Sequence, residues 1–548
     1  MIKGFIKRAK NGESVYINEV RDIFASANTA IECLVETTAG ETHRWTIPLP
    51  CIDDAEERKY IRDYFHANIY NIISVFGGKY MTLNSNSNDV FLKELCAGLN
   101  EVFQVNTPRI NRSGYGKSLN VTDRVNAAMG FPPFHFKIIN SKEGVENKTP
   151  KAKEDSVSKF KKAVKSASCS TLIGLDIGGT DIKAAGAING RIVTLKEYDW
   201  NPAGMTKIEQ LTDGIDSVVK EVLIELGESN KPDAIGIGFP DVIILNKIVG
   251  GETLKTRGIR KSSPDYETEF AKLLGLNEML LAYCKPGGFV NMTNDGSLAA
   301  FTAAVELAFS NRPDEIKHGV LAHTLGTELG TGWVDENGNI PQIPLEIYNC
   351  IIDLGNYPAR AFKPFDLRST LNFNTLIAGT MQKYASQSGA YRLALECFKS
   401  DAAELYNELF NRGFIEERDT GIYVITSPED KRKPLLEYIM KLADEGQPQA
   451  EEVFREIGKC LAATWFETEF LLNPEAKRRI LYGRFVKSFK CLSLLQEGAT
   501  EITDITLEPG DDNLAFTPLM QELRDNPDYT VAQFGQAIGA IHFAAEGL

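Results

Sequence analysis

The sequence lacks any apolar run that approaches the roughly 18 residues of a membrane-spanning helix. Its first residues, MIKGFIKRAKNGES, carry positive charges, but no apolar segment of the kind found in a secretory signal follows them. These two absences argue against a membrane protein and against a secreted one. We therefore expect a cytoplasmic protein without membrane association.

Closely spaced cysteine pairs are also absent. The nine cysteines are scattered along the chain, and none stands in a C-x-x-C or C-x-C pattern. An odd, dispersed set is typical of reduced thiols that serve as small core residues. The sequence thus predicts neither a disulfide framework nor a structural zinc site.

Composition and charge indicate a folded chain with two unlike parts. At 548 residues the chain is long enough for about three or four domains, and its 43% hydrophobic and 24% charged residues are ordinary for a globular protein. The net charge of −14 makes nucleic acid an unfavourable partner for the whole molecule. Residues 1–170 nevertheless carry 24 Lys and Arg against 19 Asp and Glu, whereas the remainder carries 36 against 55.

The first part has the pattern of a small α+β domain over residues 1–140. Residues 29–49 alternate apolar and polar residues around Ala39-Gly40, which predicts a hairpin. Asp53 followed by Glu56 is a capping-box pattern that precedes apolar residues at helical spacing. A second helix is expected over 89–103, and the polar, lysine-rich residues 141–170 are expected to form a linker, with room for one surface helix. The domain should fold separately, so a chain that starts near residue 165 should keep any binding site that lies beyond the linker.

From residue 171 the pattern changes to short apolar strands alternating with long helices, which is typical of an α/β fold. The expected strands are 171–177, 184–188, 191–197, 234–239, 319–325 and 480–486, and the expected helices are 206–227, 295–310, 371–411, 434–472 and 531–546.

Neither familiar phosphate loop occurs where a glycine-rich turn follows the first of these strands. The stretch LDIGGTDIK lacks the G-x-G-x-x-G of dinucleotide sites and the G-x-x-x-x-G-K-[ST] of P-loops. It does place a carboxylate, exposed backbone N–H groups, a hydroxyl and a cation together, which suits a phosphate chain with its Mg²⁺. The residues are Asp176, Gly178, Gly179, Thr180 and Lys183. An ordinary β-hairpin would account for the two glycines equally well.

Three further stretches fit the same chemistry. HTLGTELGTG repeats small hydroxyl residues between glycines that would let the backbone approach a phosphate; its candidate residues are Thr324, Gly326 and Thr327. Asn294-Asp295 opens an alanine-rich helix, where the pair could hold and deprotonate a hydroxyl or could simply cap the helix. The stretch LNPEAKRRILYGRFV is an apolar strand that ends at Gly483, and by itself it has a structural explanation.

With these stretches in order, residues 171–548 resemble the ROK family of repressors and sugar kinases, within the hexokinase–actin–Hsp70 ATPase superfamily. DIGGTDIK, AIGIGFPD, TNDGSLAA, TLGTELGTG and LNPEAKRRILYGRF look like the family's successive motifs. The resemblance implies two actin-like (ribonuclease H-like) lobes around an ATP cleft, at residues 171–310 and 311–548. A largely helical insertion at about 353–450 replaces the family's cysteine-rich zinc motif.

The resemblance also implies roles for individual residues. Asp295 would be the catalytic base, and Asn294, Glu346 and Asn349 would bind the sugar, with Asn349 in place of the family's histidine. Asp176 would hold Mg²⁺ through water. The other glycine, threonine and lysine residues named above would contact ATP, including Gly483 on the adenosine side.

Three functions remain open from the sequence. The first is an ATP-dependent kinase that phosphorylates a sugar or sugar-like hydroxyl. The second is a sugar-sensing regulator, which the positive charge of residues 1–170 favours but which lacks a helix-turn-helix pattern there. The third is a nucleotide-binding assembly protein without turnover, and a homo-oligomer is compatible with each of the three.

Overall fold

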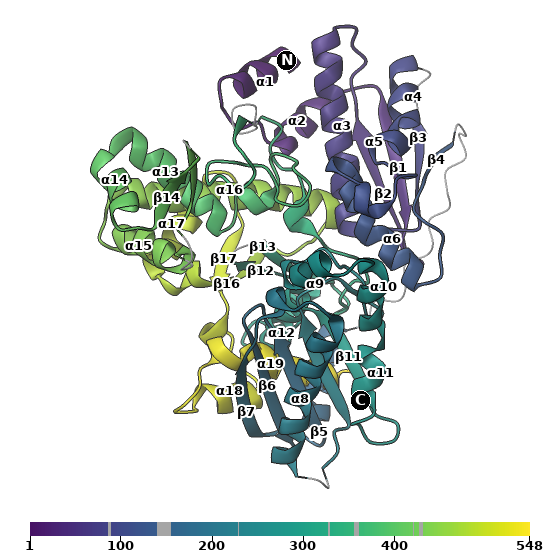
Figure 1. Cartoon of the computed structure of the whole chain (residues 1–548), viewed down its shortest axis with the longest axis vertical. Helices are drawn as coiled ribbons and strands as arrows, with labels where there is room; N and C mark the ends of the chain where they lie inside the picture. The colour runs from purple at the N-terminus through teal and green to yellow at the C-terminus, as the bar shows by residue number, and fades with distance from the viewer. Residues whose placement is uncertain are drawn as a thin grey trace.

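A computed structural model describes residues 1–85, 89–139, 155–227, 230–326, 329–355, 361–419, 421–426 and 431–548. Three parts follow one another along the chain (Figure 1): an N-terminal domain, a first lobe built on a five-stranded sheet, and a second lobe built on a four-stranded sheet with a helical insertion. None of the helices among these residues is both long and apolar enough to cross a bilayer.

The N-terminal domain is α+β, as the sequence predicts. Its four strands are β1 (Ala30–Glu36), β2 (Thr42–Pro48), β3 (Tyr80–Ser85) and β4 (Phe136–Ile139), in the order β2-β1-β3-β4. Its helices are α1 (Ile2–Lys10), α2 (Ile17–Phe24), α3 (Ala55–Phe76), α4 (Val90–Ala97), α5 (Leu99–Val102) and α6 (Ser118–Ala128). The predicted hairpin is confirmed. The cap of α3 is Asp54, not Asp53, because the Asp54 carboxylate accepts the N–H groups of Glu56 and Glu57.

The first lobe contains the sheet β11-β8-β5-β6-β7. The bounds are β5 (Thr171–Ile177), β6 (Asp181–Ile188), β7 (Arg191–Asp199), β8 (Ala234–Phe239) and β11 (Phe289–Asn294). Strands β5, β8 and β11 are parallel, and β5, β6 and β7 are antiparallel. Helix α8 (Ile208–Leu226) packs on β6 and β7. Smaller elements are the β9–β10 hairpin (Ile243–Ile244, Lys247–Ile248) and helices α9 (Arg257–Ser262), α10 (Tyr266–Ala271) and α11 (Leu276–Leu281).

The C-terminal helix α19 (Val531–Ala545) lies directly on this first sheet. A Cβ added to Gly236 of β8 would stand 1.9 Å from the Ala540 carbonyl oxygen, and one added to Gly174 of β5 would stand 2.1 Å from that of Ala537. Both strands therefore need glycine where the helix crosses them. The second lobe was predicted to run to residue 548, but helix α19 packs on the sheet of the first lobe.

The second lobe contains the sheet β13-β12-β16-β17. The bounds are β12 (Val320–Leu325), β13 (Leu329–Val334), β16 (Arg478–Gly483) and β17 (Thr506–Pro509). Helix α12 (Asp295–Phe309) packs on β12 and β13 and also against α19, so these two helices lie between the two sheets. The remaining helices are α13 (Gln387–Asp401), α14 (Ala403–Asn411), α15 (Arg432–Asp444), α16 (Pro448–Leu472), α17 (Phe489–Thr500) and α18 (Pro518–Arg524), with a hairpin of β14 (Ile415–Arg418) and β15 (Ile422–Ile425).

The insertion is less helical than its sequence suggests. The helix expected over 371–411 begins only at Gln387, because residues 361–386 run as turns and single bridges. The helix expected over 434–472 is two helices, since Gly446 has φ of +82° and Pro448 starts the second one.

The core of the N-terminal domain is continuous with that of the second lobe. Most of its buried apolar residues belong to one cluster that extends from Ile2 and Tyr64 to Leu321 and Trp465. Polar contacts cross the same boundary. Buried Asn71 donates to Glu467 at 2.9 Å and accepts the Ile351 N–H at 2.7 Å. These contacts argue against the expectation that residues 1–140 fold separately.

The predicted linker is also too long. Residues 140–154 lie outside the described residues, but Ser156–Ala167 form helix α7, which packs against α12 and α19. Phe160 and Val164 of this helix are buried beside Phe301. The amphipathic pattern hidden among the lysines thus makes α7 part of the folded body rather than a connection.

Candidate functional site

A cleft of about 780 Å³ lies between the two sheets, and the ends of β5, β11, β12 and β16 contribute to its walls. It brings together most of the residues that the sequence singled out. Its lining includes Asp176, Gly179, Thr180, Asn294, Asp295, Thr324, Gly326, Glu346 and Gly483. Gly178, Lys183 and Asn349 are not in this lining, and Thr327 lies outside the described residues.

The turn after β5 presents one carboxylate to the cleft. Burial raises the pKa of Asp176 to about 7, and the nearby Asp295 carboxylate adds to this rise while Lys183 opposes it. Lys183 itself is bound to Asp181 at 2.6 Å. The N–H of Gly178 donates to the Asp181 carbonyl at 2.8 Å. Both groups are thus used inside the hairpin, which leaves Gly179 and Thr180 as the residues of this turn that face the cleft.

The strand ends of the second sheet line the same cleft as the turn after β5. Thr324 lies near the end of β12 and Gly326 follows that strand directly. Gly483 ends the neighbouring strand β16, where it pairs with Leu325. Gly483 has φ of +105°, and a Cβ there would stand 2.7 Å from the Leu325 carbonyl oxygen. Only glycine fits this position, since it must turn the chain and pass close to β12.

Gly332 of the HTLGTELGTG stretch and Gly296 of TNDGSLAA have a packing role that the sequence did not suggest. A Cβ on Gly332 would lie 1.8 Å from the carbonyl oxygen of Gly296, and a Cβ on Gly296 would lie 2.8 Å from that of Thr331. These contacts press the first turn of α12 against β13. Gly332 therefore positions the helix that carries Asp295 instead of making room for a phosphate.

Asn294 and Asp295 stand at the start of α12, half-exposed in the cleft. The side-chain oxygen Oδ1 of Asn294 accepts the Gly296 N–H at 2.9 Å, and its side-chain Nδ2 donates to the Asp241 carbonyl oxygen at 3.0 Å. The capping role is thus confirmed. Burial raises the pKa of Asp295, and the nearby Lys255 ammonium opposes that rise. A carboxylate with a raised pKa is better suited to accept a proton.

Sequence reasoning missed the loop Gly250–Thr256, which contributes Glu252, Thr253 and Lys255 to the same cleft. Asp241 holds this loop in place, because its buried carboxylate accepts the N–H of Gly251 at 3.0 Å and that of Val242 at 2.7 Å. Burial raises the pKa of Asp241 to about 6, against these hydrogen bonds. The stretch GGETLK, a glycine pair followed by hydroxyl and charged residues after a strand, was the signal that could have pointed to it.

Lys255 occupies a central place in this loop. Its Cε would be 3.4 Å from a Cβ placed on Gly179, and its charge opposes the rise in the pKa of Asp295. No ion pair within 4.0 Å joins it to any residue that the structure describes. One cation thus lies between the turn after β5 and the carboxylate at the start of α12.

Glu346 reaches the cleft from the second lobe. Its carboxylate accepts the Tyr348 hydroxyl and the Asn349 amide, both at 3.0 Å. Asn349 lines an adjoining pocket of about 30 Å³ together with Tyr70, Ser118 and Thr122 of the N-terminal domain. Asn349 therefore orients Glu346, and its predicted direct contact with an acceptor is not supported by its position.

The opposite end of the cleft is more basic. Arg432, Arg484 and Lys487 line it together with Gln387, whose N–H donates to the Gly326 carbonyl at 3.0 Å. Arg432 and Gln387 belong to the insertion. The insertion thus contributes to the cleft wall beside the end of β12.

No protein-family model matches the sequence, and no curated protein is similar to it. The structure is similar at low identity to solved ROK-family proteins over about two thirds of the chain. The ROK hexokinase of Thermus thermophilus matches with a TM-score of 0.41 and 15% identity, over 67% of this chain and 98% of that one. A ROK-family glucokinase of Streptomyces griseus, in complex with glucose and AMPPNP, matches with 0.40 and 18%, over 68% and 98%.

A ROK-family transcriptional regulator, a homologue of the E. coli MLC protein, matches to a similar extent: TM-score 0.41 and 14% identity, over 69% of this chain and 81% of that one. Kinases and a regulator thus stand side by side among the similar structures. The function has to be inferred from the residues of the cleft.

Proposed function

We propose that the chain is a kinase that transfers the γ-phosphoryl group of Mg-ATP to a hydroxyl of a sugar or sugar-like acceptor. The observation that carries this proposal is the convergence of Asp176 and Asp295, from the first sheet and α12, with the strand-end loops of the second sheet in one cleft. Phosphoryl transfer depends mainly on positioning and electrostatic stabilisation, which such a set of groups supplies.

Asp295 is the general base in this proposal. Its carboxylate accepts the proton of the attacking hydroxyl, and its raised pKa makes it a stronger acceptor than an exposed aspartate. Asn294, Thr253 and Glu346 surround the same end of the cleft. Their amide, hydroxyl and carboxylate groups are suited to bind the other hydroxyls of a polyhydroxylated acceptor.

The phosphate chain would lie between the turn after β5 and the end of β12. Gly179, Thr180, Thr324 and Gly326 offer small side chains and hydroxyls there. Asp176, a partly exposed carboxylate at a strand end, is suited to hold Mg²⁺, which supplies neutralisation of phosphate charge when bound. Lys255 adds a fixed positive charge between these groups and Asp295, where charge develops during transfer.

The test is a coupled ADP-release assay with Mg-ATP over a panel of monosaccharides and their amino and acylamino derivatives, using the full-length chain. We expect release of ADP that depends on one acceptor class and is lost in Asp295→Asn prepared in parallel, which excludes a contaminating kinase. Binding of AMPPNP is measured separately by calorimetry. Absence of acceptor-dependent ADP release across the panel would overturn the proposal, and AMPPNP binding without turnover would then favour a regulator or a nucleotide-binding protein.

A regulator would behave differently. It would bind nucleotide or sugar without turnover and would shift genomic DNA fragments in a gel. The N-terminal domain offers no support for this alternative, because Val121 of its helix α6 lines the cleft and its core is continuous with that of the second lobe.

A further inference from the structure

Helix α6 of the N-terminal domain packs against the first lobe as well. Val121 and Val125 of this helix form a small apolar cluster with Val242, Ile244 and Val249, which flank or belong to the β9–β10 hairpin. The ammonium of Lys247 donates to the Ala128 carbonyl at 2.9 Å at the end of the same helix. A domain whose core continues into the second lobe thus also holds the first lobe, beside the loop Gly250–Thr256.

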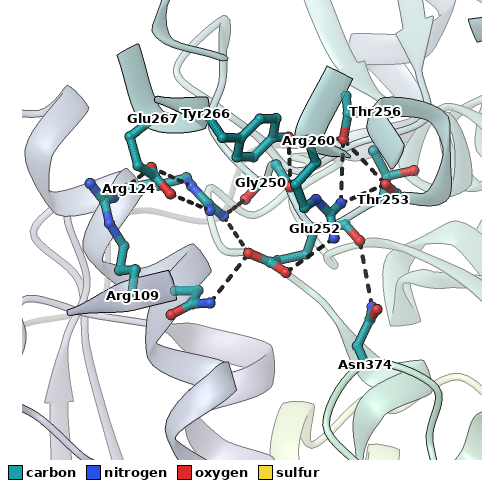
Figure 2. A network of polar contacts seen from close by, with 12 residues as sticks. Arg109, Arg124, Gly250, Glu252, Thr253, Thr256, Arg260, Tyr266, Glu267 and Asn374 are labelled. Carbon is teal, nitrogen blue, oxygen red and sulfur yellow. Dashed lines mark hydrogen bonds and ion pairs between the residues drawn. The ribbon is translucent and has the colours of Figure 1, made fainter. Parts of the chain in front are cut away.

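Arg124 of α6 is the centre of this contact (Figure 2). Its guanidinium donates to both carboxylate oxygens of Glu267, at 2.9 and 2.7 Å, to Glu252 at 2.8 Å, and to the Gly250 carbonyl at 2.6 Å. The side chain is only 7% exposed. A buried, planar fork that satisfies three partners fixes their relative positions more tightly than a surface ion pair does.

Two of the three partners of Arg124, Gly250 and Glu252, line the cleft. The loop that Arg124 holds continues directly to Thr253 and Lys255. Val121, one helical turn before Arg124, lines the same cleft from α6. Glu252 is further held by Arg260, which lies 3.6 Å from it and donates to the Thr253 carbonyl (Figure 2).

We propose that helix α6 forms part of the acceptor end of the cleft and that Arg124 is a positioning residue, which holds the loop Gly250–Thr256 so that Lys255 and Thr253 face Asp295. The assignment of this end of the cleft to the acceptor rests on the proposed kinase function. The positioning of the loop by the N-terminal domain rests on the contacts alone.

Removing the guanidinium should leave the fold intact. In Arg124→Gln the Glu252 carboxylate keeps Arg260, and the Glu267 carboxylate keeps Arg109 at 3.2 Å. Arg109→Gln is the matched control, because Arg109 contacts Glu267 at the edge of the network and, in the part of the chain that the structure describes, forms no hydrogen bond or ion pair with the loop Gly250–Thr256. Arg124→Lys keeps the charge but loses the fork, and we expect it to restore part of the effect.

The first measurement needs no substrate. Hydrogen–deuterium exchange of the full-length variants should show about tenfold faster exchange of amides in residues 250–256 in Arg124→Gln, and unchanged exchange in Arg109→Gln. Unchanged exchange in Arg124→Gln would overturn the inference whatever the protein's activity. A melting temperature recorded for each variant shows whether the fold is retained.

The second measurement separates the inference from the proposed function. With an active wild type, Arg124→Gln should raise KM for the acceptor about tenfold or more while KM for Mg-ATP changes less than about twofold. Equal effects on both constants, or none, would refute the acceptor-end placement. A wild type that releases no ADP with any acceptor refutes the kinase proposal instead, and leaves the exchange result to decide whether Arg124 positions the loop.

Discussion

The carboxylate of Asp295 touches the N–H of its own helix start and otherwise faces the cleft. In Asp295→Asn the amide cannot accept the proton of the attacking hydroxyl, so we expect kcat and kcat/KM to fall by about 10²–10⁴-fold. The capping residue Asn294 is unchanged in this variant, so stability should change little. Steady-state kinetics and AMPPNP calorimetry check the two halves of this prediction. A variant with near wild-type turnover would remove Asp295 from the mechanism.

Asp176→Asn is the informative comparison for that variant. Its carboxylate is placed to hold Mg²⁺ instead of moving a proton, so its loss should raise the Mg²⁺ concentration needed for half-maximal activity. The Asp295 variant should leave that concentration unchanged. Titration of both variants with MgCl₂ distinguishes the two roles, and identical Mg²⁺ curves would contradict them.

The pH dependence of activity should reflect these two carboxylates. Both act as carboxylates, and burial raises the pKa of Asp295 and that of Asp176, the latter to about 7. As pH falls through these raised values the groups take up protons, so kcat/KM should decline well above the range of an ordinary aspartate. A profile of kcat/KM recorded at saturating Mg²⁺, which holds Asp176 ionised, checks the direction for Asp295, and an unchanged rate down to about pH 5 would contradict its assignment as the base.

Lys255 offers a test of the loop that the sequence left unnoticed. Lys255→Met removes the charge beside the transferring group and should lower kcat by about 10²-fold or more, with a smaller effect on nucleotide binding. Lys261→Met is the control, since Lys261 is an exposed lysine of the same segment. Equal activity of the two variants would show that Lys255 has no part in transfer.

The site residues that could be predicted from the sequence are those whose position is determined by the local sequence pattern. Asp295 follows a strand and starts a helix, and Gly483 ends an apolar strand, so both reach the cleft as expected. Lys183 and Gly178 were assigned to phosphate binding. In the structure the Lys183 ammonium pairs with the Asp181 carboxylate, and the Gly178 N–H donates to the Asp181 carbonyl oxygen. A pairing inside a hairpin cannot be read from residue types alone.

At the scale of elements, the fold depends on close helix–sheet contacts made by glycine. In Gly236→Ala the new methyl group would collide with the Ala540 carbonyl of α19, since the Cβ position lies 1.9 Å away. We expect a loss of about 1–3 kcal/mol in the free energy of unfolding, from forced separation of helix and strand. Urea denaturation measures it, with Gly275→Ala as control because nothing lies within 4 Å of its Cβ position. Equal midpoints for the two variants would contradict the packing argument.

Elements with a long, regular pattern were predicted closely, such as α8 and α19, whereas β13 and β17 were missed. Gly330 and Gly332 of β13 are needed beside Thr324 and Gly296, so the strand is formed by tertiary contacts and not by its own propensity. The start of α13 was misplaced for a similar reason. Residues 371–386 are rich in helix-compatible residues, but Asn372 accepts the N–H groups of Asn374 and Thr375 in a turn.

At the scale of the whole molecule, the N-terminal domain cannot be removed without exposing the core of the second lobe. A chain of residues 155–548 would lose helices α2 and α3, which pack on α16, and would leave the buried carboxylate of Glu467 without Arg21. We expect this chain to aggregate or to lack a cooperative unfolding transition. Circular dichroism and size-exclusion chromatography are the measurements, and a monodisperse, cooperatively folded product would refute the shared-core description. This expectation replaces the one drawn from the lysine-rich segment alone.

The position of α19 on the first sheet sets an order for folding during synthesis. Gly174 and Gly236 leave the ribosome long before Ala537 and Ala540, the residues that cover them. Until the last helix emerges, the growing chain carries a formed or forming sheet with one apolar face open to solvent. The first lobe is thus among the earliest α/β segments to be made and among the last to be completed. Between synthesis of its sheet and synthesis of α19, the nascent chain is most exposed to aggregation and most dependent on protection by chaperones.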